Sequence, residues 1–268
     1  MVYPEHIWNA GVMPLSNEVL DEMFRTGQTQ TPGGDFIDVH SQIERPYAEA
    51  LHGVVLREGF EDVLEVGFAF GVSSLAILTA LDDLGRGSLT SLDPLQDTDW
   101  QDCGVHAVER SGLAGRHTLI RQPDYLAMPA LLADARAFDL IYIDGWHTFD
   151  YTLLDLFFAG KLLKIGGVIG LNDGGFPAVH AALLAFLAHR DYVEIDVGLM
   201  PEFWNREGAQ VGANAADRYF RKVSDHEPDW DFHTAWWSAA QVGPTPLRRA
   251  ARHARHRARQ LRNALTSR

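Results

Sequence analysis

The sequence predicts an α/β protein built on a mainly parallel β-sheet that helices cover on both faces. Between residues 41 and 198, short apolar runs rich in β-branched and aromatic residues alternate about five times with longer stretches of helical spacing. The short runs have the composition of strands that are buried on both faces. Hydrophobic residues make up 46% of the 268 residues, which is enough for a sizeable core.

The individual elements follow from this alternation. Each expected strand is an apolar run that ends at turn residues, and each expected helix has apolar residues at helical spacing. The expected strands are 62–67, 87–93, 117–122, 138–144, 166–173 and 192–198, and residues 217–224 could form a last edge strand. The expected helices are 41–59, 72–85, 100–112, 125–136, 148–164 and 177–190.

Other segments do not keep the alternation. We expect residues 1–40 to be irregular, because they carry turn signals such as TPGGD. Residues 41–224 would form the main domain, followed by an aromatic-rich extension at 225–245 and a basic tail at 246–268 that favours a helix. The aromatic residues could form a cap over a site, or a hydrophobic seam or dimer contact. The tail could be solvated or dock on an acidic partner subunit, or it could attach to a membrane surface or to nucleic acid.

Charge and composition argue against several classes of protein. The net charge is −13, and the tail holds eight arginines and no acid, so the other 15 basic and 36 acidic residues give the body a formal −21. Such a body repels nucleic acid, and we expect no nucleic acid partner. No apolar run approaches the roughly 20 residues that span a bilayer. The single cysteine, Cys103, and the absence of a signal-peptide pattern indicate a cytoplasmic protein.

Glycines and polar residues gather where the expected strands end. Ligands of parallel sheets bind beyond the carboxyl ends of the strands, so these positions are the candidates for a site. Glycines allow a tight turn close to a ligand, and aspartates can accept hydrogen bonds from a ribose or an adenine, although each could equally cap a turn or helix. In chain order the candidates are Glu65, Gly67, Gly71, Asp93, Asp124, Asp144, His147, Asn172 and Asp173.

The first turn argues against a nicotinamide dinucleotide site. That site needs the spacing Gly-x-Gly-x-x-Gly. Here three residues separate Gly67 from Gly71, and no third glycine stands at the required place. An NAD-dependent oxidoreductase therefore remains an alternative only, as does a non-catalytic donor-binding or scaffold protein.

The ordered motifs resemble the class I S-adenosylmethionine-dependent methyltransferases. The stretches VLEVGFAFGVSSLAILTAL, GRGSLTSLDP, QPDYLAMPALL, FDLIYIDGWHTFDYTLLDL and LLKIGGVIGLNDGG carry the resemblance, which covers about residues 41–198. They look most like the metal-dependent O-methyltransferase branch, which includes catechol-type and macrocin-type enzymes. The resemblance implies a Rossmann-like doubly wound fold and a hydroxyl acceptor on a small molecule, with a sugar or natural product favoured. One departure is Ala69, where the family usually has a glycine.

The resemblance also implies roles for single residues. S-adenosylmethionine would contact Glu65, Gly67, Phe68 and Gly71 near its methionine part, Asp93 at its ribose, Asp124 and Tyr125 at its adenine, and Asp144. A divalent ion, Mg²⁺ or another, would be held by Asp144, Asn172 and Asp173. With Asp144 as metal anchor, His147 would be the general base that takes the proton of the acceptor hydroxyl.

Three features leave alternatives open. The family usually has an acid at the position of Asn172, so this metal site would be less charged and transfer could proceed without the ion. His147 could instead begin a helix with a solvated ring, and Trp146 could line the acceptor pocket or simply pack. The stretch DGWH replaces the Asp/Asn-Pro-Pro-aromatic run of enzymes that methylate nucleic acid bases, which argues against that class.

Overall fold

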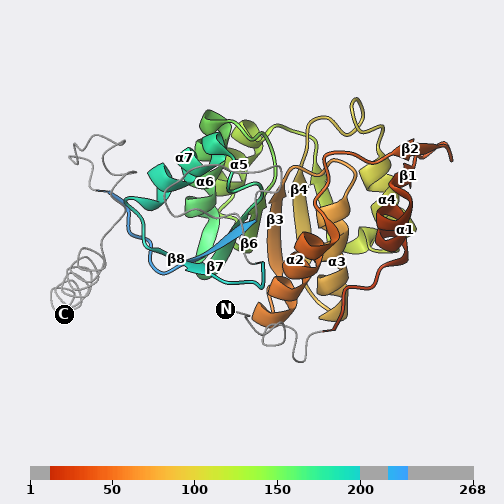
Figure 1. Ribbon diagram of the computed structural model, residues 1–268. Coiled ribbons are helices and arrows are strands. Elements are labelled where there is room, and N and C mark those ends of the chain that lie inside the picture. Colours follow the sequence, from red (N-terminus) through yellow and green to blue (C-terminus); the bar gives the residue numbers. More distant parts are fainter. Residues whose placement is uncertain (1–12, 200–216, 229–268) are drawn as a thin grey trace.

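The structure is a computed structural model that describes residues 13–199 and 217–228. A seven-stranded sheet lies between two layers of helices (Figure 1). Its order is β5-β4-β3-β6-β7-β9-β8, and the first five strands run parallel to one another. The strands are β3 (Asp62–Val66), β4 (Ser88–Leu92), β5 (His117–Ile120), β6 (Phe138–Ile143), β7 (Leu163–Leu171), β8 (Tyr192–Ile195) and β9 (Arg218–Lys222). The predicted fold class is confirmed.

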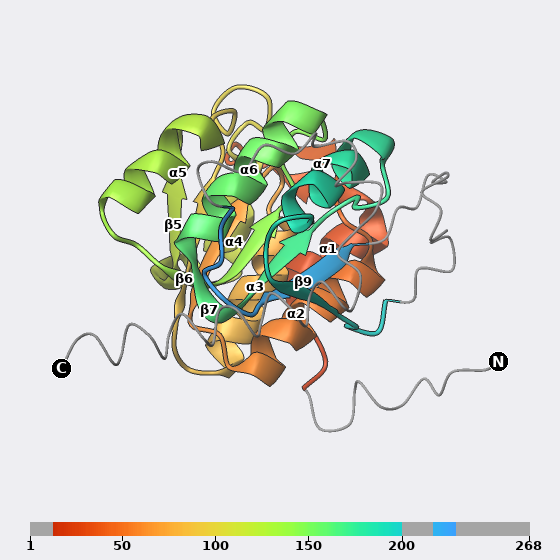
Figure 2. The same ribbon diagram turned by 90° about the vertical axis from the view of Figure 1, so that its left-hand side faces the viewer.

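The helices divide between the two faces of the sheet, as Figure 2 shows with α5, α6 and α7 above the strands and α2 and α3 below. One layer consists of α2 (Arg45–Glu58), α3 (Val72–Asp83) and α4 (Cys103–Arg110). The other consists of α5 (Asp124–Ala133), α6 (Phe149–Leu162) and α7 (Pro177–Leu187). All six were expected from the sequence, with bounds that differ by a few residues.

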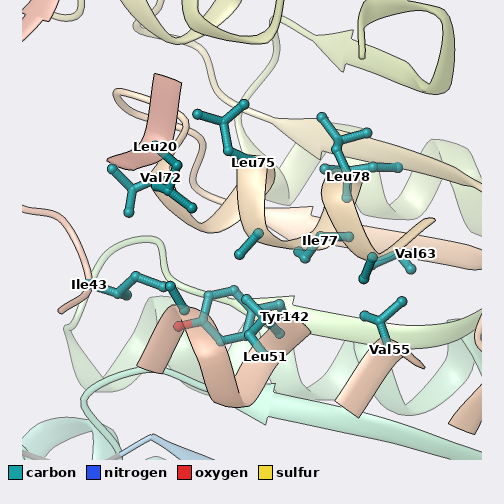
Figure 3. Close-up of a cluster of buried hydrophobic side chains, with 14 of the residues drawn as sticks. Leu20, Ile43, Leu51, Val55, Val63, Val72, Leu75, Ile77, Leu78 and Tyr142 are labelled. Atoms are coloured by element: carbon teal, nitrogen blue, oxygen red, sulfur yellow. The ribbon is translucent and has the colours of Figure 1, made fainter. Parts of the chain in front are cut away.

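Alternate strand residues supply the two hydrophobic cores, because successive side chains of a strand point to opposite faces. Val63 and Tyr142 point to the first layer, where Figure 3 shows them beside Leu51 and Val55 of α2 and Leu78 of α3. Their neighbours in sequence belong to the core under the other layer. Burial on both faces explains why these strands are apolar throughout.

The segment before α2 is more regular than expected. Residues 18–26 form α1 (Glu18–Thr26), and a short antiparallel pair follows, β1 (Gln28–Gln30) with β2 (Phe36–Asp38). The side chain of Asn17 caps the helix by accepting from two backbone amides, and Gly27 ends it with a φ of +68°. The expectation of an irregular segment is therefore wrong for these residues. The cap and the glycine were the available signals.

The last strand is not at an edge. β9 lies between β7 and β8 and is antiparallel to both. Lys222 at its end is buried, and its ammonium donates to the carbonyls of Gly160 and Leu163, both at 2.8 Å. These carbonyls stand at the end of α6, where backbone acceptors need donors from outside the helix. Lys222 thus links β9 to the C-terminal end of α6.

Several expected features lie outside the described residues. They include the basic tail at 246–268 and most of the aromatic-rich extension at 225–245, of which only 225–228 is described. Within the described ranges, no helix has the length and apolar character required to cross a membrane.

Candidate active site

The strand register places the predicted site residues in one row. The last paired residues of four neighbouring strands lie side by side, namely Leu92, Val66, Ile143 and Leu171. The residues that come next are, across the sheet, Asp93, Gly67, Asp144 and Asn172. Their amides continue the ladder by donating to the neighbouring strands, at 2.8 to 3.1 Å. The predicted convergence of strand ends on one edge is confirmed.

The turn after β3 depends on backbone conformations that favour glycine. Gly67 has a φ of +92°, and a Cβ there would lie 2.0 Å from the carbonyl oxygen of Asp144. Ala69 and Gly71 also have positive φ, at +46° and +82°. A Cβ on Gly104 would stand 2.5 Å from the carbonyl oxygen of Ala69, so α4 packs directly on this turn. The turn is therefore compact and closely backed on two sides.

Glu65 lies beneath this turn and is fully buried. Its carboxylate accepts hydrogen bonds from the hydroxyls of Ser73 (2.6 Å), Ser91 (2.7 Å) and Ser74. Burial raises the pKa of Glu65 to about 7, although the three hydroxyls oppose the shift. The carboxyl group ties β3 to α3 and β4 and thereby supports the turn from below.

Asp93 holds the same turn from the side. Its Oδ2 accepts from the amides of Phe68 (3.3 Å) and Ala69 (2.8 Å) and from the amide side chain of Gln96 (3.1 Å). Its Oδ1 accepts from the amide of Leu95 at 2.8 Å. A carboxylate offers about four acceptor positions, so this one is well satisfied within the protein. The sequence did not reveal this supporting task.

A hollow opens beside the turn and reaches Asp144. It is lined by residues 41–43, 67–70, 72 and 73 and by Asp144. The helix expected over 41–59 begins only at Arg45, and the freed residues 41–43 supply one wall. The ring of Phe68 is buried against that of His117, with 4.8 Å between centroids. One hollow thus joins the first motif to the fourth strand.

A second group of residues lies around the start of α5. Asp124 is its first residue, and its Oδ1 accepts from the amide of Tyr125 at 2.7 Å. Asp155 of α6 is 1% exposed, and its carboxyl group lies near that of Asp124. Burial raises the pKa of Asp155 to about 9, and the charge of Asp124 adds to the shift. Burial beside a second carboxyl group disfavours the charged form, so Asp155 holds its proton to a higher pH than an exposed aspartate does.

Aromatic rings stand in the open next to this carboxyl pair. Trp146 is 60% and Tyr125 is 45% exposed. Each has its ring centroid 6.2 Å from that of Tyr151, which lies between them. Trp146 therefore does not simply pack in the core. Tyr151 was not a candidate in the sequence, because only the turn of α6 brings it next to the other two rings.

Three side-chain oxygens converge on the imidazole of His147. Its Nε2 lies 3.0 Å from Oδ1 of Asn172, 3.6 Å from Oδ1 of Asp144 and 3.6 Å from Oδ2 of Asp173. The φ of Asp173 is +50°, a strained conformation for an aspartate at the end of a strand. The predicted meeting of the fourth and fifth strands at one polar cluster is confirmed.

The cluster brings several carboxyl groups close together. Burial raises the pKa of Asp144 well above its usual range, and the charges of Asp217, Glu65 and Asp173 raise it further. Burial also raises the pKa of Asp173. In the described part of the chain, no group of three His, Cys, Asp or Glu side chains is arranged to hold a metal ion. The convergent set here is instead two carboxylates and an amide.

Asp217 is a member of the cluster that the sequence did not suggest. It is 5% exposed, and its carboxylate accepts from the hydroxyl of Tyr142 (2.7 Å) and from Nδ2 of Asn172 (2.9 Å). Burial raises its pKa to about 7 against the effect of these hydrogen bonds. It precedes β9, whose antiparallel direction brings the start of the strand to the edge where the parallel strands end.

Comparison with known proteins decides the class. Residues 64–174 match a protein family described as a methyltransferase domain, and they include the turn, Asp93, Asp124 and the polar cluster up to Asp173. Residues 64–174 therefore carry a methyltransferase domain, and the sheet has the class I methyltransferase fold. Domains of this class take their methyl group from S-adenosylmethionine, as the sequence resemblance implied. No curated protein matches the sequence.

Solved structures share the fold of this methyltransferase. The Podospora anserina methyltransferase PaMTH1, bound to S-adenosylhomocysteine, is 16% identical with a TM-score of 0.57, and the match covers 84% of this chain and 99% of that one. The O-methyltransferase TomG of Streptomyces achromogenes is 17% identical with a TM-score of 0.57, covering 83% and 100%. An O-methyltransferase of Bacillus cereus is 17% identical with a TM-score of 0.52, covering 81% and 98%.

Proposed function

We propose that this methyltransferase transfers the methyl group of S-adenosylmethionine to a hydroxyl group of a small molecule. The observation that carries the proposal is the row of strand ends, in which the glycine turn stands directly beside Asp144 and the oxygen cluster around His147. A methyl donor over the turn and an acceptor at the cluster would therefore be neighbours. Two of the fold relatives are O-methyltransferases, and TomG acts in tomaymycin synthesis, which supports a natural product as acceptor.

The donor would lie along the first half of the row. Its methionine part would rest at Gly67, Phe68 and Gly71 with Glu65 beneath, and its ribose beside Asp93. Its adenine would reach the start of α5, where Asp124 accepts hydrogen bonds and the exposed rings of Tyr125 and Trp146 offer flat apolar faces. A positively charged sulfonium or ammonium group of the donor would favour the ionised form of Asp144, which burial otherwise disfavours.

The residues of the cluster suit a divalent cation. Two carboxylate oxygens and one amide oxygen face a common point, and oxygen is the ligand that Mg²⁺ prefers. The acidic groups there raise one another's pKa, and a bound cation would relieve their repulsion. Asp144, Asn172 and Asp173 would hold the ion. When bound, it would lower the pKa of the acceptor hydroxyl and fix its orientation.

The reaction needs a base and an alignment. His147 would accept the proton of the acceptor hydroxyl, and the oxygen would attack the methyl carbon as the carbon–sulfur bond breaks. The electron pair of that bond stays on sulfur, and neutral S-adenosylhomocysteine leaves. The turn and the cluster would hold oxygen, carbon and sulfur in line.

A transfer assay tests the proposal. The protein is incubated with S-adenosylmethionine carrying a labelled methyl group and a panel of sugars and phenolic natural products, with EDTA or with Mg²⁺. The proposal predicts a methyl ether as product, less of it with EDTA, and recovery with Mg²⁺. Equal turnover in both conditions would remove the metal from the mechanism. A label found only on nitrogen or carbon would overturn the choice of acceptor.

A further inference from the structure

A hydrogen-bonded chain leads from Asp217 to the imidazole of His147. The carboxylate of Asp217 accepts from Nδ2 of Asn172 at 2.9 Å, and Oδ1 of Asn172 lies 3.0 Å from Nε2 of His147. The three residues come from different places in the sequence, namely the start of β9, the end of β7 and the turn after β6. These hydrogen bonds therefore depend on the antiparallel pairing of β9 with β7.

We propose that Asp217 is a positioning residue, which fixes the orientation and the tautomer of His147 through the side-chain amide of Asn172. The inference rests on the proposed function, in which His147 is the base. It does not need a bound metal, and it is tested on metal-free protein.

The carboxylate determines which way the amide points. It accepts from the hydroxyl of Tyr142, the amide nitrogen of Asn172 and the backbone amide of Asp173. The NH₂ group of Asn172 must then face Asp217, and its oxygen must face His147. With Asp217 only 5% exposed, water cannot easily take over this role.

The amide in turn determines the tautomer. An amide oxygen can only accept, so Nε2 of His147 must carry the hydrogen in the contact at 3.0 Å. The neutral ring then has its lone pair on Nδ1. The base of the proposed reaction is therefore Nδ1.

Asp217→Asn tests this hydrogen-bonded chain because the substitution should reverse the direction of its hydrogen bonds. The introduced amide would accept from Tyr142 and donate its own NH₂ group to Asn172, whose amide would flip and donate to Nε2 of His147. The proton of the neutral ring would then move to Nδ1. Tyr142→Phe removes another donor to the same carboxylate and leaves the amide in place, so it is the matched control. The double variant N172D/D217N restores an acceptor opposite Nε2.

The measurement is the ¹⁵N spectrum of selectively labelled His147 in EDTA-treated protein at pH 8.5, where protonated and unprotonated ring nitrogens are well separated. Wild type and Tyr142→Phe should show the Nε2–H tautomer, Asp217→Asn the Nδ1–H tautomer, and the double variant Nε2–H again. With an acceptor, Asp217→Asn should lose kcat by about 10²–10⁴-fold, the share of a general base, while S-adenosylhomocysteine binds as before.

The outcomes separate this inference from the proposed function. Nδ1–H in the wild-type protein, or an unchanged tautomer in Asp217→Asn, would overturn the inference even if the protein methylates hydroxyls. The expected set of tautomers would support it even if no hydroxyl acceptor is found, because the spectrum requires no methyl transfer. If Asp217→Asn does not fold, the wild-type spectrum and the double variant still decide.

Discussion

Replacing Gly67 by alanine tests how closely the donor turn is backed by the fourth strand. The added Cβ would lie 2.0 Å from the carbonyl oxygen and 2.7 Å from the carbonyl carbon of Asp144, which are backbone atoms that cannot turn away. The φ of +92° is also one that residues with a side chain rarely adopt. The conformation costs about 1–2 kcal/mol and the overpacking about 1–3 kcal/mol. We expect the free energy of unfolding to fall by about 2–5 kcal/mol.

Gly53 provides the matched control. It lies inside α2, has no positive φ, and a Cβ there would meet nothing within 4 Å. Gly53→Ala should leave stability unchanged or raise it by about 0.5–1 kcal/mol, because alanine favours a helix interior. Urea denaturation of both variants gives the comparison, and S-adenosylhomocysteine affinity measured on folded Gly67→Ala should fall. A Gly67→Ala protein within about 0.5 kcal/mol of wild type, the usual effect of a surface change, would refute the reasoning.

Three further predictions concern the site. His147→Ala should lower turnover by about 10²–10⁴-fold and leave donor binding intact, whereas His106→Ala in α4 should change neither; equal losses would remove the base role. Asp93→Ala removes the acceptor of two turn amides and should weaken S-adenosylhomocysteine binding in calorimetry. An unchanged affinity would contradict the proposed place of Asp93 in the donor site. The pKa of Asp155 is raised from 3.8 to about 9, so the folded state holds a proton that the unfolded state loses, and stability falls as pH rises through that window. The Asp155→Asn variant lacks this titration. Between pH 5 and 8, its free energy of unfolding relative to that of wild type should therefore rise by about 1.4 kcal/mol per pH unit in denaturation experiments. A difference that does not change with pH would argue against the buried proton.

The sequence predicted the parallel part of the fold because its signals are local. The strand expected at 138–144 is β6 at Phe138–Ile143, and the helix expected at 72–85 is α3 at Val72–Asp83. An apolar run between turn residues identifies a buried strand without knowledge of its neighbours. The order of the parallel strands then brings Asp144 and Asn172 together.

The residues that the sequence did not reveal depend on pairings between distant segments. Asp217 reaches the cluster only because β9 is inserted antiparallel between β7 and β8, and nothing near residue 217 indicates that partner. The proton of Asp155 likewise depends on the approach of α5 to α6. The orientation of the Asn172 amide depends on Asp217 in turn. Local patterns give elements and strand ends, whereas the network that orients the side chains comes from tertiary pairing.

Titration calorimetry with S-adenosylhomocysteine tests the central claim most directly, namely that the strand ends form a methyl-donor site. We predict that one molecule binds per chain and that NADH produces no heat and does not compete. Binding of NADH in place of S-adenosylhomocysteine, or no binding of either to the folded protein, would contradict the account.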